Sequence, residues 1–297
     1  MNRAILAWLA LGLTTATSPG AATWQVPDDF PSVQAAIDGA SVGDRIELAP
    51  GRYYEGLDLR GGISLVGMGQ EPGDVILEGE GVRTVGTLVD DTGLLVIENL
   101  TIREGFGIHG AGLYLENARI RLDRVTFVGC GSMLEGGAFF ARDVDMEASF
   151  CVFYRNYSWG TDGAAIYLEG QGPLGTGQQF ENCTFAGTSL CCGNVAIYLR
   201  FGTPRFDNCI LEEILCGEGA QPVLSCNSGD FCGVDGGGHI PGDPRFCDLG
   251  GGDLRLGTDS PCLPENNGGC GLIGALGSCN DDSPARAVSF GHLKTLY

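Results

Sequence analysis

One short apolar phrase recurs five times between residues 97 and 211, and this repeat limits the folds open to the chain. In each copy two apolar residues flank one outward position, which is the period-2 pattern of a strand. The start-to-start spacings are 25, 26, 32 and 26 residues. Strand repeats of this length, without helical periodicity, are typical of a solenoid in which each coil packs on its neighbours. The copies are Asn99–Ile102, Arg124–Phe127, Phe150–Phe153, Asn182–Phe185 and Asn208–Leu211.

A second phrase follows four of these copies after a Gly-rich turn, at 112–115, 137–140, 165–168 and 196–199. Each second phrase carries one aromatic residue that we expect to point outward. Stacked coils lie about 4.8 Å apart, so the rings should form a ladder on one face. Such a ladder could stack on the apolar faces of sugar rings, and mutual stacking that stabilises the sheet is the stronger alternative. The ligand-binding candidates are Tyr114, Phe139, Tyr167 and Tyr198.

The charge balance restricts the partners. The chain has 37 acidic and 17 basic residues, with a formal net charge of −20. Phosphate binding needs clustered Lys and Arg, so this balance argues against nucleic acid as a partner. The sole lysine, Lys294, lies near the C-terminus.

The N-terminus has the pattern of a secretory signal peptide. Arg3 supplies a positive charge, Ala4 to Thr15 is apolar, and small residues precede a cleavage site after Ala22. The apolar run is too short for a comfortable membrane span, and no later stretch qualifies. We therefore expect a protein secreted to the exterior or cell surface of a bacterium, without a membrane span after removal of the signal.

Thirteen cysteines fit an oxidising compartment. Cys151, Cys183 and Cys209 share one inward position of the repeat, so we expect them to form a buried stack of free thiols. The other ten could form up to five disulfides, mostly in the C-terminal half. A zinc site is disfavoured because the chain has no Cys-x-x-Cys pair. These ten are Cys130, Cys191, Cys192, Cys216, Cys226, Cys232, Cys247, Cys262, Cys270 and Cys279.

The chain before the repeat predicts one helix followed by short strands. After an expected strand at Thr23–Val26, Pro31 begins an amphipathic helix, for which Ser32 and Asp29 are candidate caps. A helix there would cover the open first coil of a solenoid. The expected organisation is a signal peptide at 1–22, a solenoid at 23–279 and a linker with a short tail at 280–297. Within the solenoid, 23–44 is the N-terminal cap and 212–279 is a disulfide-rich end.

Three stretches also carry a family pattern: Phe30–Asp38 with Gly51-Arg52-Tyr53-Tyr54-Glu55, Phe153-x-x-Asn156, and Asp243-Pro244-Arg245-Phe246. They resemble the right-handed parallel β-helix proteins of the pectin-lyase-like superfamily, including bacterial secreted β-helix-repeat proteins. Pectinesterases share the Gly-x-Tyr-x-Glu opening. The resemblance covers about residues 23 to 279. It implies an all-β fold, a single-stranded right-handed parallel β-helix solenoid with an N-terminal capping helix.

The resemblance also implies where catalytic groups would lie, in a groove beside one sheet. A lysine-base lyase is excluded because the body of the chain has no lysine. Arg103 and Arg155 remain as candidate bases, although surface ion pairs are the favoured interpretation. Asp90 and Asp91 are the adjacent carboxylates that a hydrolase would need, although turn residues often have this pattern. The Gly-His-Gly signature and the downstream pectinesterase signatures are absent, so Tyr53 and Glu55 are interpreted as structural.

A Gly-rich acidic stretch makes calcium the one cation to consider, because hard cations favour clustered carboxylate oxygens. The stretch lacks a regular Gly-Gly-x-Gly-x-Asp array, so we expect no resident metal and keep calcium as the alternative. Its carboxylates are Asp230, Asp235, Asp243, Asp248 and Asp253.

Two functions follow from these observations. The first is a secreted, non-catalytic β-helix protein that contacts polysaccharide or a cell-surface glycan along its solenoid face. The second is a polysaccharide-active lyase or glycoside hydrolase with a groove site that carries no recognised signature. The missing signatures favour the first. The two functions can be distinguished by the charged residues that converge along the Thr101/Thr126/Thr184 face.

Overall fold

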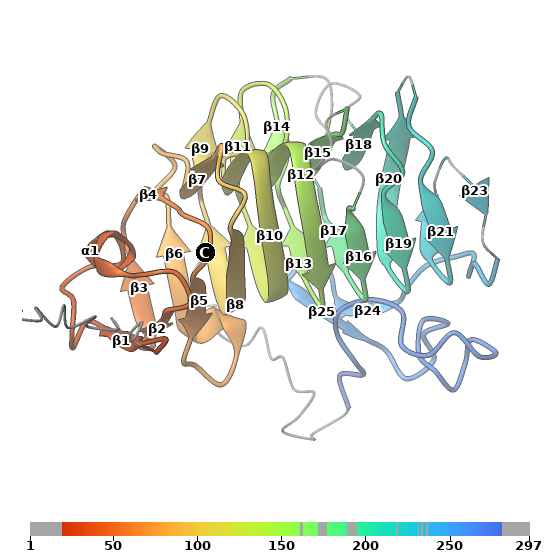
Figure 1. Cartoon of the computed structure of the whole chain (residues 1–297). Helices are drawn as coiled ribbons and strands as arrows, with labels where there is room; N and C mark the ends of the chain where they lie inside the picture. The colour runs from red at the N-terminus through yellow and green to blue at the C-terminus, as the bar shows by residue number, and fades with distance from the viewer. Residues whose placement is uncertain are drawn as a thin grey trace, which may run out of the picture.

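A computed structural model describes the chain between residues 20 and 280 (Figure 1). The described residues are 20–160, 163–171, 177–188, 195–217, 219–230, 232, 234–235 and 237–280. Nearly all of the expected signal peptide and tail lies outside them, as do Cys191 and Cys192. In the described part of the chain, no helix has the length and apolar character needed to cross a membrane.

Most of the structure is one 20-stranded sheet whose strands pair in parallel between successive coils. The sheet winds around the core as three faces. Face I contains β1 (Thr23–Val26), β2 (Arg45–Leu48), β5 (Ser64–Gly67), the first half of β8 (Leu94–Arg103), the middle of β10 (Leu113–Val128), most of β12 (Phe139–Ser149), β16 (Gln179–Glu181), β19 (Arg205–Asp207), β21 (Val223–Ser225) and β23 (Val234–Asp235).

Faces II and III are built in the same way from the other parts of each coil. Face II contains β3 (Gly51–Tyr53), β6 (Val75–Glu78), the ends of β8 and β10, β13 (Val152–Tyr154), β17 (Thr184–Ala186), the start of β20 (Ile210–Cys216) and β22 (Ser228–Asp230). Face III contains β4 (Leu57–Asp58), β7 (Gly86–Val89), the starts of β10 and β12, β15 (Ile166–Glu169), β18 (Ile197–Arg200) and the end of β20.

A small separate sheet lies between faces II and III and contains β9 (Phe106–Gly107), β11 (Gly131–Ser132) and β14 (Tyr157–Ser158). The described residues form one α-helix, and this stacking of parallel coils is the architecture of a parallel β-helix, as the repeat predicts. Its expected right-handedness stays a prediction.

The first residue of each repeat phrase makes the corner between faces I and II. Asn99, Asn182 and Asn208 adopt left-handed backbone conformations there, with φ values of 52°, 50° and 54°. Asparagine tolerates this conformation better than most residues. Arg124 and Phe150 occupy the same corner with φ values of 51° and 52°. One left-handed residue between two extended segments therefore turns the chain from one face to the next.

The core fills the inside of the coils with stacked side chains. On face II, the rings of Phe127 and Phe153 lie 5.0 Å apart and those of Phe153 and Phe185 lie 4.4 Å apart, both nearly parallel. All three are fully buried. Aromatic rings contribute large buried areas, so these stacks stabilise the register between coils.

Helix α1 (Val33–Gly39) packs against β1, β2 and β4 at the N-terminal end, and Ser32 caps it as expected. Glu55 accepts hydrogen bonds from the backbone N–H groups of Val33 and Gln34 at 2.9 and 3.0 Å. The Tyr53 hydroxyl donates to the Ala49 carbonyl at 2.8 Å. The Gly-x-Tyr-x-Glu residues thus tie the helix to the first coil, which supports their structural interpretation.

The C-terminal segment 240–280, called the strap here, runs back outside the coils (blue in Figure 1). It contains the antiparallel strands β24 (Phe246–Asp248) and β25 (Asp253–Leu256). Leu254, Ala275 and Leu276 of the strap pack on outward residues of face II such as Val152 and Tyr154. The strap therefore covers part of this face with a second apolar layer.

Three disulfides lie in the C-terminal part, joining Cys216 to Cys232, Cys226 to Cys270 and Cys247 to Cys279. The first bridges the last coils, the second ties the strap to the coils and the third closes the strap on itself. Cys151, Cys183 and Cys209 are free and buried, as the repeat predicts. The expectation that Cys130 and Cys262 are bridged is wrong, because both are free and buried within the described structure. Each fills an interior position, which the spacing of cysteines in a sequence does not reveal.

Burial should protect these thiols from reagents. It raises the pKa of the Cys130 thiol to about 12 and raises those of Cys151 and Cys183. In a Cys191→Ser/Cys192→Ser variant, we expect the five thiols to resist alkylation at about pH 8 until the protein is unfolded. Thiol titration in native buffer and in denaturant checks this. A count of three in denaturant would mean that Cys130 and Cys262 are bridged.

Candidate functional site

The outward side of face II is the surface on which the threonines of the repeat lie. Thr101, Thr126 and Thr184 are all buried there. Thr101 donates to the Pro72 carbonyl at 3.0 Å, in the short helix η1 (Pro72–Asp74). Thr184 accepts a hydrogen bond from the Ala275 N–H of the strap at 2.9 Å. Two segments thus cover this face, η1 at the N-terminal end and the strap at the C-terminal end.

A cavity of about 380 Å³ lies between these two covers. Pro72 lines one side and strap residues such as Leu276 line the other. Its floor includes Thr126 and Val152, and Phe150 with 42% of its surface exposed stands at its edge. A mainly apolar cavity of this size with a few polar groups is typical of a small-ligand site.

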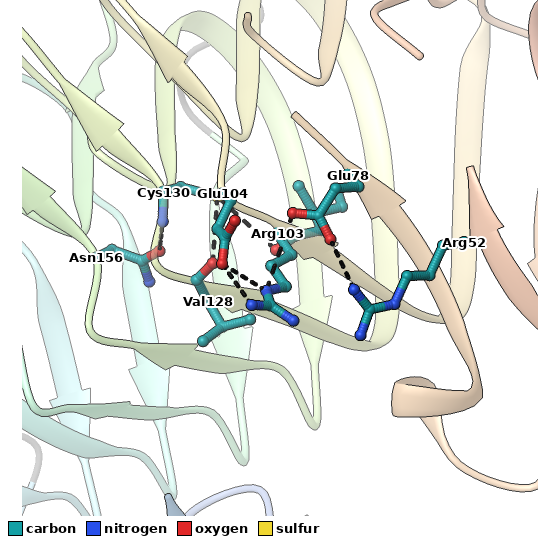
Figure 2. Close-up of polar contacts among 8 residues, drawn as sticks. Arg52, Glu78, Arg103, Glu104, Val128, Cys130 and Asn156 are labelled. Carbon is teal, nitrogen blue, oxygen red and sulfur yellow. Dashed lines mark hydrogen bonds and ion pairs between the residues drawn. The ribbon is translucent and has the colours of Figure 1, made fainter. Parts of the chain in front are cut away.

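A charged cluster lies on the earlier coils of the same face (Figure 2). Glu78 of β6 pairs in register with Arg103 of β8, so their side chains point outward together. Arg103 Nε lies 4.0 Å from Glu78 and donates to Glu104 at 2.9 Å. Arg52 of β3 lies 3.9 Å from the other oxygen of Glu78. Two carboxylates and two guanidinium groups thus converge on three neighbouring coils.

The cluster holds Glu78 in an unusual environment. Glu78 and Arg103 are 4% and 6% exposed, respectively. Burial raises the pKa of Glu78, and the negative charge of Glu104 raises it further, against the opposing effect of the guanidinium of Arg103. A carboxyl group with a raised pKa near an arginine is a candidate general acid. The compensating arginines equally make the cluster a closed ion-pair network.

The cavity and the cluster are near each other on the sheet. Thr126 of β10 pairs with Thr101 of β8, and Arg103 lies two residues after Thr101 in β8. From the rise along a strand and the spacing between strands, Thr126 and Arg103 are about 8 Å apart between Cα atoms. A ligand that extends from the cavity could therefore reach the cluster.

Of the four catalytic candidates from the sequence, only Arg103 lies in this cluster. Its expected surface ion pair is in fact a buried one. Arg155 donates to the Gly250 carbonyl of the strap at 2.6 Å and lies over the Tyr154 ring, so it contacts the strap. The sequence pattern did not single out Glu78, Glu104 or Arg52. A charged residue at the outward position of an apolar strand, as in Val75–Glu78, was the available signal.

Asp90 and Asp91 form turns. Asp90 has a φ of 54° and accepts a hydrogen bond from Asn117 Nδ2 at 2.9 Å. Asp91 accepts the N–H groups of Gly61 at 2.7 Å and Gly93 at 2.9 Å, which links two neighbouring coils. Both carboxylates thus have structural partners, in agreement with the turn interpretation.

The aromatic ladder exists, but one of its expected members is wrong. Tyr114 pairs with Phe140, Phe140 with Tyr167, and Tyr167 with Tyr198. Phe139 points inward and is fully buried. Because side chains alternate along a strand, an error of one residue in the alignment of this repeat exchanged Phe139 and Phe140.

The ladder rings stack mainly on one another. Successive centroids from Tyr114 to Tyr198 are 5.4, 5.2 and 5.2 Å apart, with nearly parallel planes. Phe140 and Tyr167 are only 2% and 5% exposed. Arg142 also lies over the Phe140 ring. The inner rings thus have no open face for a sugar, and this geometry favours the stabilising interpretation of the ladder.

The acidic C-terminal stretch forms local contacts. Asp243 accepts from the Arg245 N–H, Asp248 accepts from the Gly251 N–H and Asp253 pairs with Arg255. The side chains of Asp230 and Asp235 lie outside the described residues. Within the part of the chain that is described, no three acidic, histidine or cysteine side chains are grouped closely enough to hold a metal ion.

The ladder predicts a difference between two phenylalanines. Phe140→Ala should lower the free energy of unfolding by about 3–5 kcal/mol, because it removes a buried ring from the centre of the stack. Phe150→Ala is the matched control, since that side chain is exposed, and it should cost about 0.5 kcal/mol or less. Urea denaturation measures both. Equal losses would contradict the ladder as a stabilising feature.

The raised pKa of Glu78 predicts a pH dependence of stability. Its folded-state pKa lies above the ordinary value of 4.5, so the folded protein holds this proton more tightly than the unfolded chain. Stability from this group is therefore present below about pH 4.5 and is lost as the pH rises through the folded-state pKa.

Glu78→Gln cannot ionise, so this variant does not lose stability at position 78 as the pH rises. Its free energy of unfolding relative to that of wild type should therefore increase from about pH 4 to about pH 7. Glu104→Gln removes the neighbouring negative charge and should move the effect to lower pH. Chemical denaturation across this range measures the differences. Parallel curves for wild type and Glu78→Gln would show that the pKa is not raised.

The comparisons with known proteins add little beyond this geometry. No protein-family model matches the sequence, and no curated protein matches it. Among solved structures, the chain is similar to pectin methylesterase from carrot, with a TM-score of 0.35 and 12% sequence identity. The match covers 76% of this chain and 87% of the carrot chain. A likeness of this size carries no information about activity, so the fold assignment rests on the strand pairing.

Proposed function

We propose that this protein is a non-catalytic carbohydrate-binding β-helix protein that holds a polysaccharide or cell-surface glycan on face II. The observation that carries the proposal is the composition of the cavity between η1 and the strap. None of the described residues that line it carries a carboxylate or an imidazole. The cavity thus offers groups for binding, and Arg124, which pairs with Asp123 at 3.6 Å, is the one ionisable side chain among those residues.

The groups that are present suit a sugar ring. Phe150 offers an exposed aromatic surface at the edge, and Val152 and Leu276 add apolar walls. Arg124, Asn182 and Asn208 place polar groups around them. A sugar has apolar faces and a rim of hydroxyl groups, so it matches an apolar cavity with polar groups at its border.

The proposal includes secretion by a bacterium and a right-handed coil over residues 23–279. The three disulfides support an oxidising compartment. The signal-peptide pattern of residues 1–22 agrees with it.

A polysaccharide lyase or hydrolase is the second candidate, and Glu78 is the observation that favours it. Its raised pKa, its neighbour Arg103 and its position beside the cavity fit a general acid that reaches a bound chain. The ion pairs to two arginines favour a structural role instead.

Binding and turnover can be measured on the same proteins. We expect wild type to bind at least one polysaccharide in a glycan panel, and Phe150→Ala to weaken that binding about tenfold by removing the aromatic edge. Tyr54→Ala is the matched control, because Tyr54 is 52% exposed and lies outside the cavity. Affinity electrophoresis gives the dissociation constants.

The same panel should yield no new reducing ends and no unsaturated uronate products. Turnover by wild type that Glu78→Gln abolishes would replace the binding function with the enzymatic one. If Phe150→Ala weakens binding to none of the polysaccharides that wild type binds, the cavity is not a binding site.

A further inference from the structure

A second surface, remote from the face II cavity in the winding of each coil, carries exposed aromatic residues. It follows the small sheet of β9, β11 and β14. The backbone pairing between coils extends one residue beyond these strands. The Met133 N–H donates to the Gly107 carbonyl and the Trp159 N–H donates to the Ser132 carbonyl, both at 2.9 Å. Ile108, Met133 and Trp159 therefore occupy equivalent positions on successive coils, and they are 61%, 46% and 59% exposed.

The rings on this surface have a defined arrangement. The ring centroids of Trp159 and Phe106 are 5.2 Å apart with planes at 63°, so the two rings pack edge to face. Tyr157 lies 6.5 Å from Trp159. Trp159 comes from β14's coil and Phe106 from β9's coil, so the indole must reach across the intervening coil of β11.

The intervening coil carries glycine where a side chain would block the Tyr157 ring. A Cβ atom added to Gly131 would lie 2.0 Å from Cζ of Tyr157, closer than real contacts allow. Tyr157 therefore lies directly over Gly131, against the sheet. Because Gly131 leaves room for Tyr157, and because Phe106 contacts Trp159, the rings form one aromatic surface that is exposed to solvent at Trp159.

Charged pairs border this surface. His109 Nδ1 lies 2.6 Å from Glu135, in the residues that follow Ile108 and Leu134. Arg83 pairs with Glu80 at 2.6 Å, and the Arg83 carbonyl accepts the Phe106 N–H. Donors and acceptors thus lie next to an exposed aromatic face. No acceptor for the indole N–H of Trp159 lies among the described residues.

We propose that the Trp159 platform, made of Phe106, Tyr157 and Trp159 over Gly131, is a second carbohydrate site that binds a neutral glycan by ring stacking. An immobilised indole with an open face suits a pyranose ring, whose apolar side requires a flat partner and whose hydroxyls require both donors and acceptors. The formal charge of −20 repels an acidic polymer, which favours a neutral chain. The site is independent of the face II cavity.

Trp159 can report its own occupancy. The chain has three tryptophans, so a Trp8→Phe/Trp24→Phe variant emits from Trp159 alone. We expect hydroxyethyl cellulose or galactomannan to shift this emission to shorter wavelength and to reduce its quenching by acrylamide. Polygalacturonate should do neither.

Two variants test whether the neutral glycan binds by stacking on the Trp159 platform. Trp159→Ala should weaken binding of the neutral glycan about tenfold or more, the loss typical of one aromatic stacking partner. Gly131→Ala keeps every ring but displaces Tyr157, and it should weaken binding as well. Phe150→Ala and Tyr54→Ala should leave this binding unchanged, which distinguishes the platform from the face II cavity.

Three results would overturn the proposal. The first is that neither neutral glycan changes the Trp159 emission. The second is binding that Trp159→Ala leaves intact. The third is a wild-type dimer in sedimentation that Trp159→Ala dissociates, because a second copy of the chain would then occupy the platform.

Discussion

The structure depends on the parallel hydrogen-bond ladder between successive coils. Each coil satisfies the backbone groups of the one before it, and the identical register along each face places equivalent side chains above one another. Inside, this alignment produces the Phe127, Phe153 and Phe185 stack. Outside, it produces the aromatic ladder, the ion-pair cluster and the Trp159 platform. A single left-handed residue, such as Asn99 or Asn182, turns the chain at the same corner in successive coils, so equivalent residues stay aligned.

The strap adds a constraint that the coils alone lack. Hydrogen bonds from Ala275 to Thr184 and from Arg155 to Gly250 attach it to face II, and the Cys226–Cys270 disulfide anchors it covalently. It converts an open sheet surface into a bounded cavity. The charged cluster of Glu78 and Arg103 lies on the earlier coils of the same face. The cavity and the charged cluster are therefore adjacent but separate, and this separation supports the proposed binding function.

The sequence predicted local features better than shared surfaces. The Ser32 cap, the inward column of Cys151, Cys183 and Cys209 and the turn role of Asp91 follow from short-range rules, and the structure shows each of them. The outward position of Phe139 was wrong because period-2 patterns change face with one residue of misalignment. Phe139 and Phe140 are both apolar, so the local sequence offered nothing to choose between them.

The sequence by itself determined the stack of parallel coils, because the apolar phrase recurs at a length that only a solenoid can pack. Its charge balance also predicts that nucleic acid is a disfavoured partner. Only the tertiary structure decided where a cavity and an exposed aromatic surface form. The strap returns to face II across about 90 residues of sequence separation, as the Asn182 to Leu272 contact shows. Trp159 and Phe106 meet across an intervening coil, and beside them the Tyr157 ring lies over Gly131, which leaves room for it. Such contacts depend on which surfaces meet after the coils have stacked, and no local pattern encodes them.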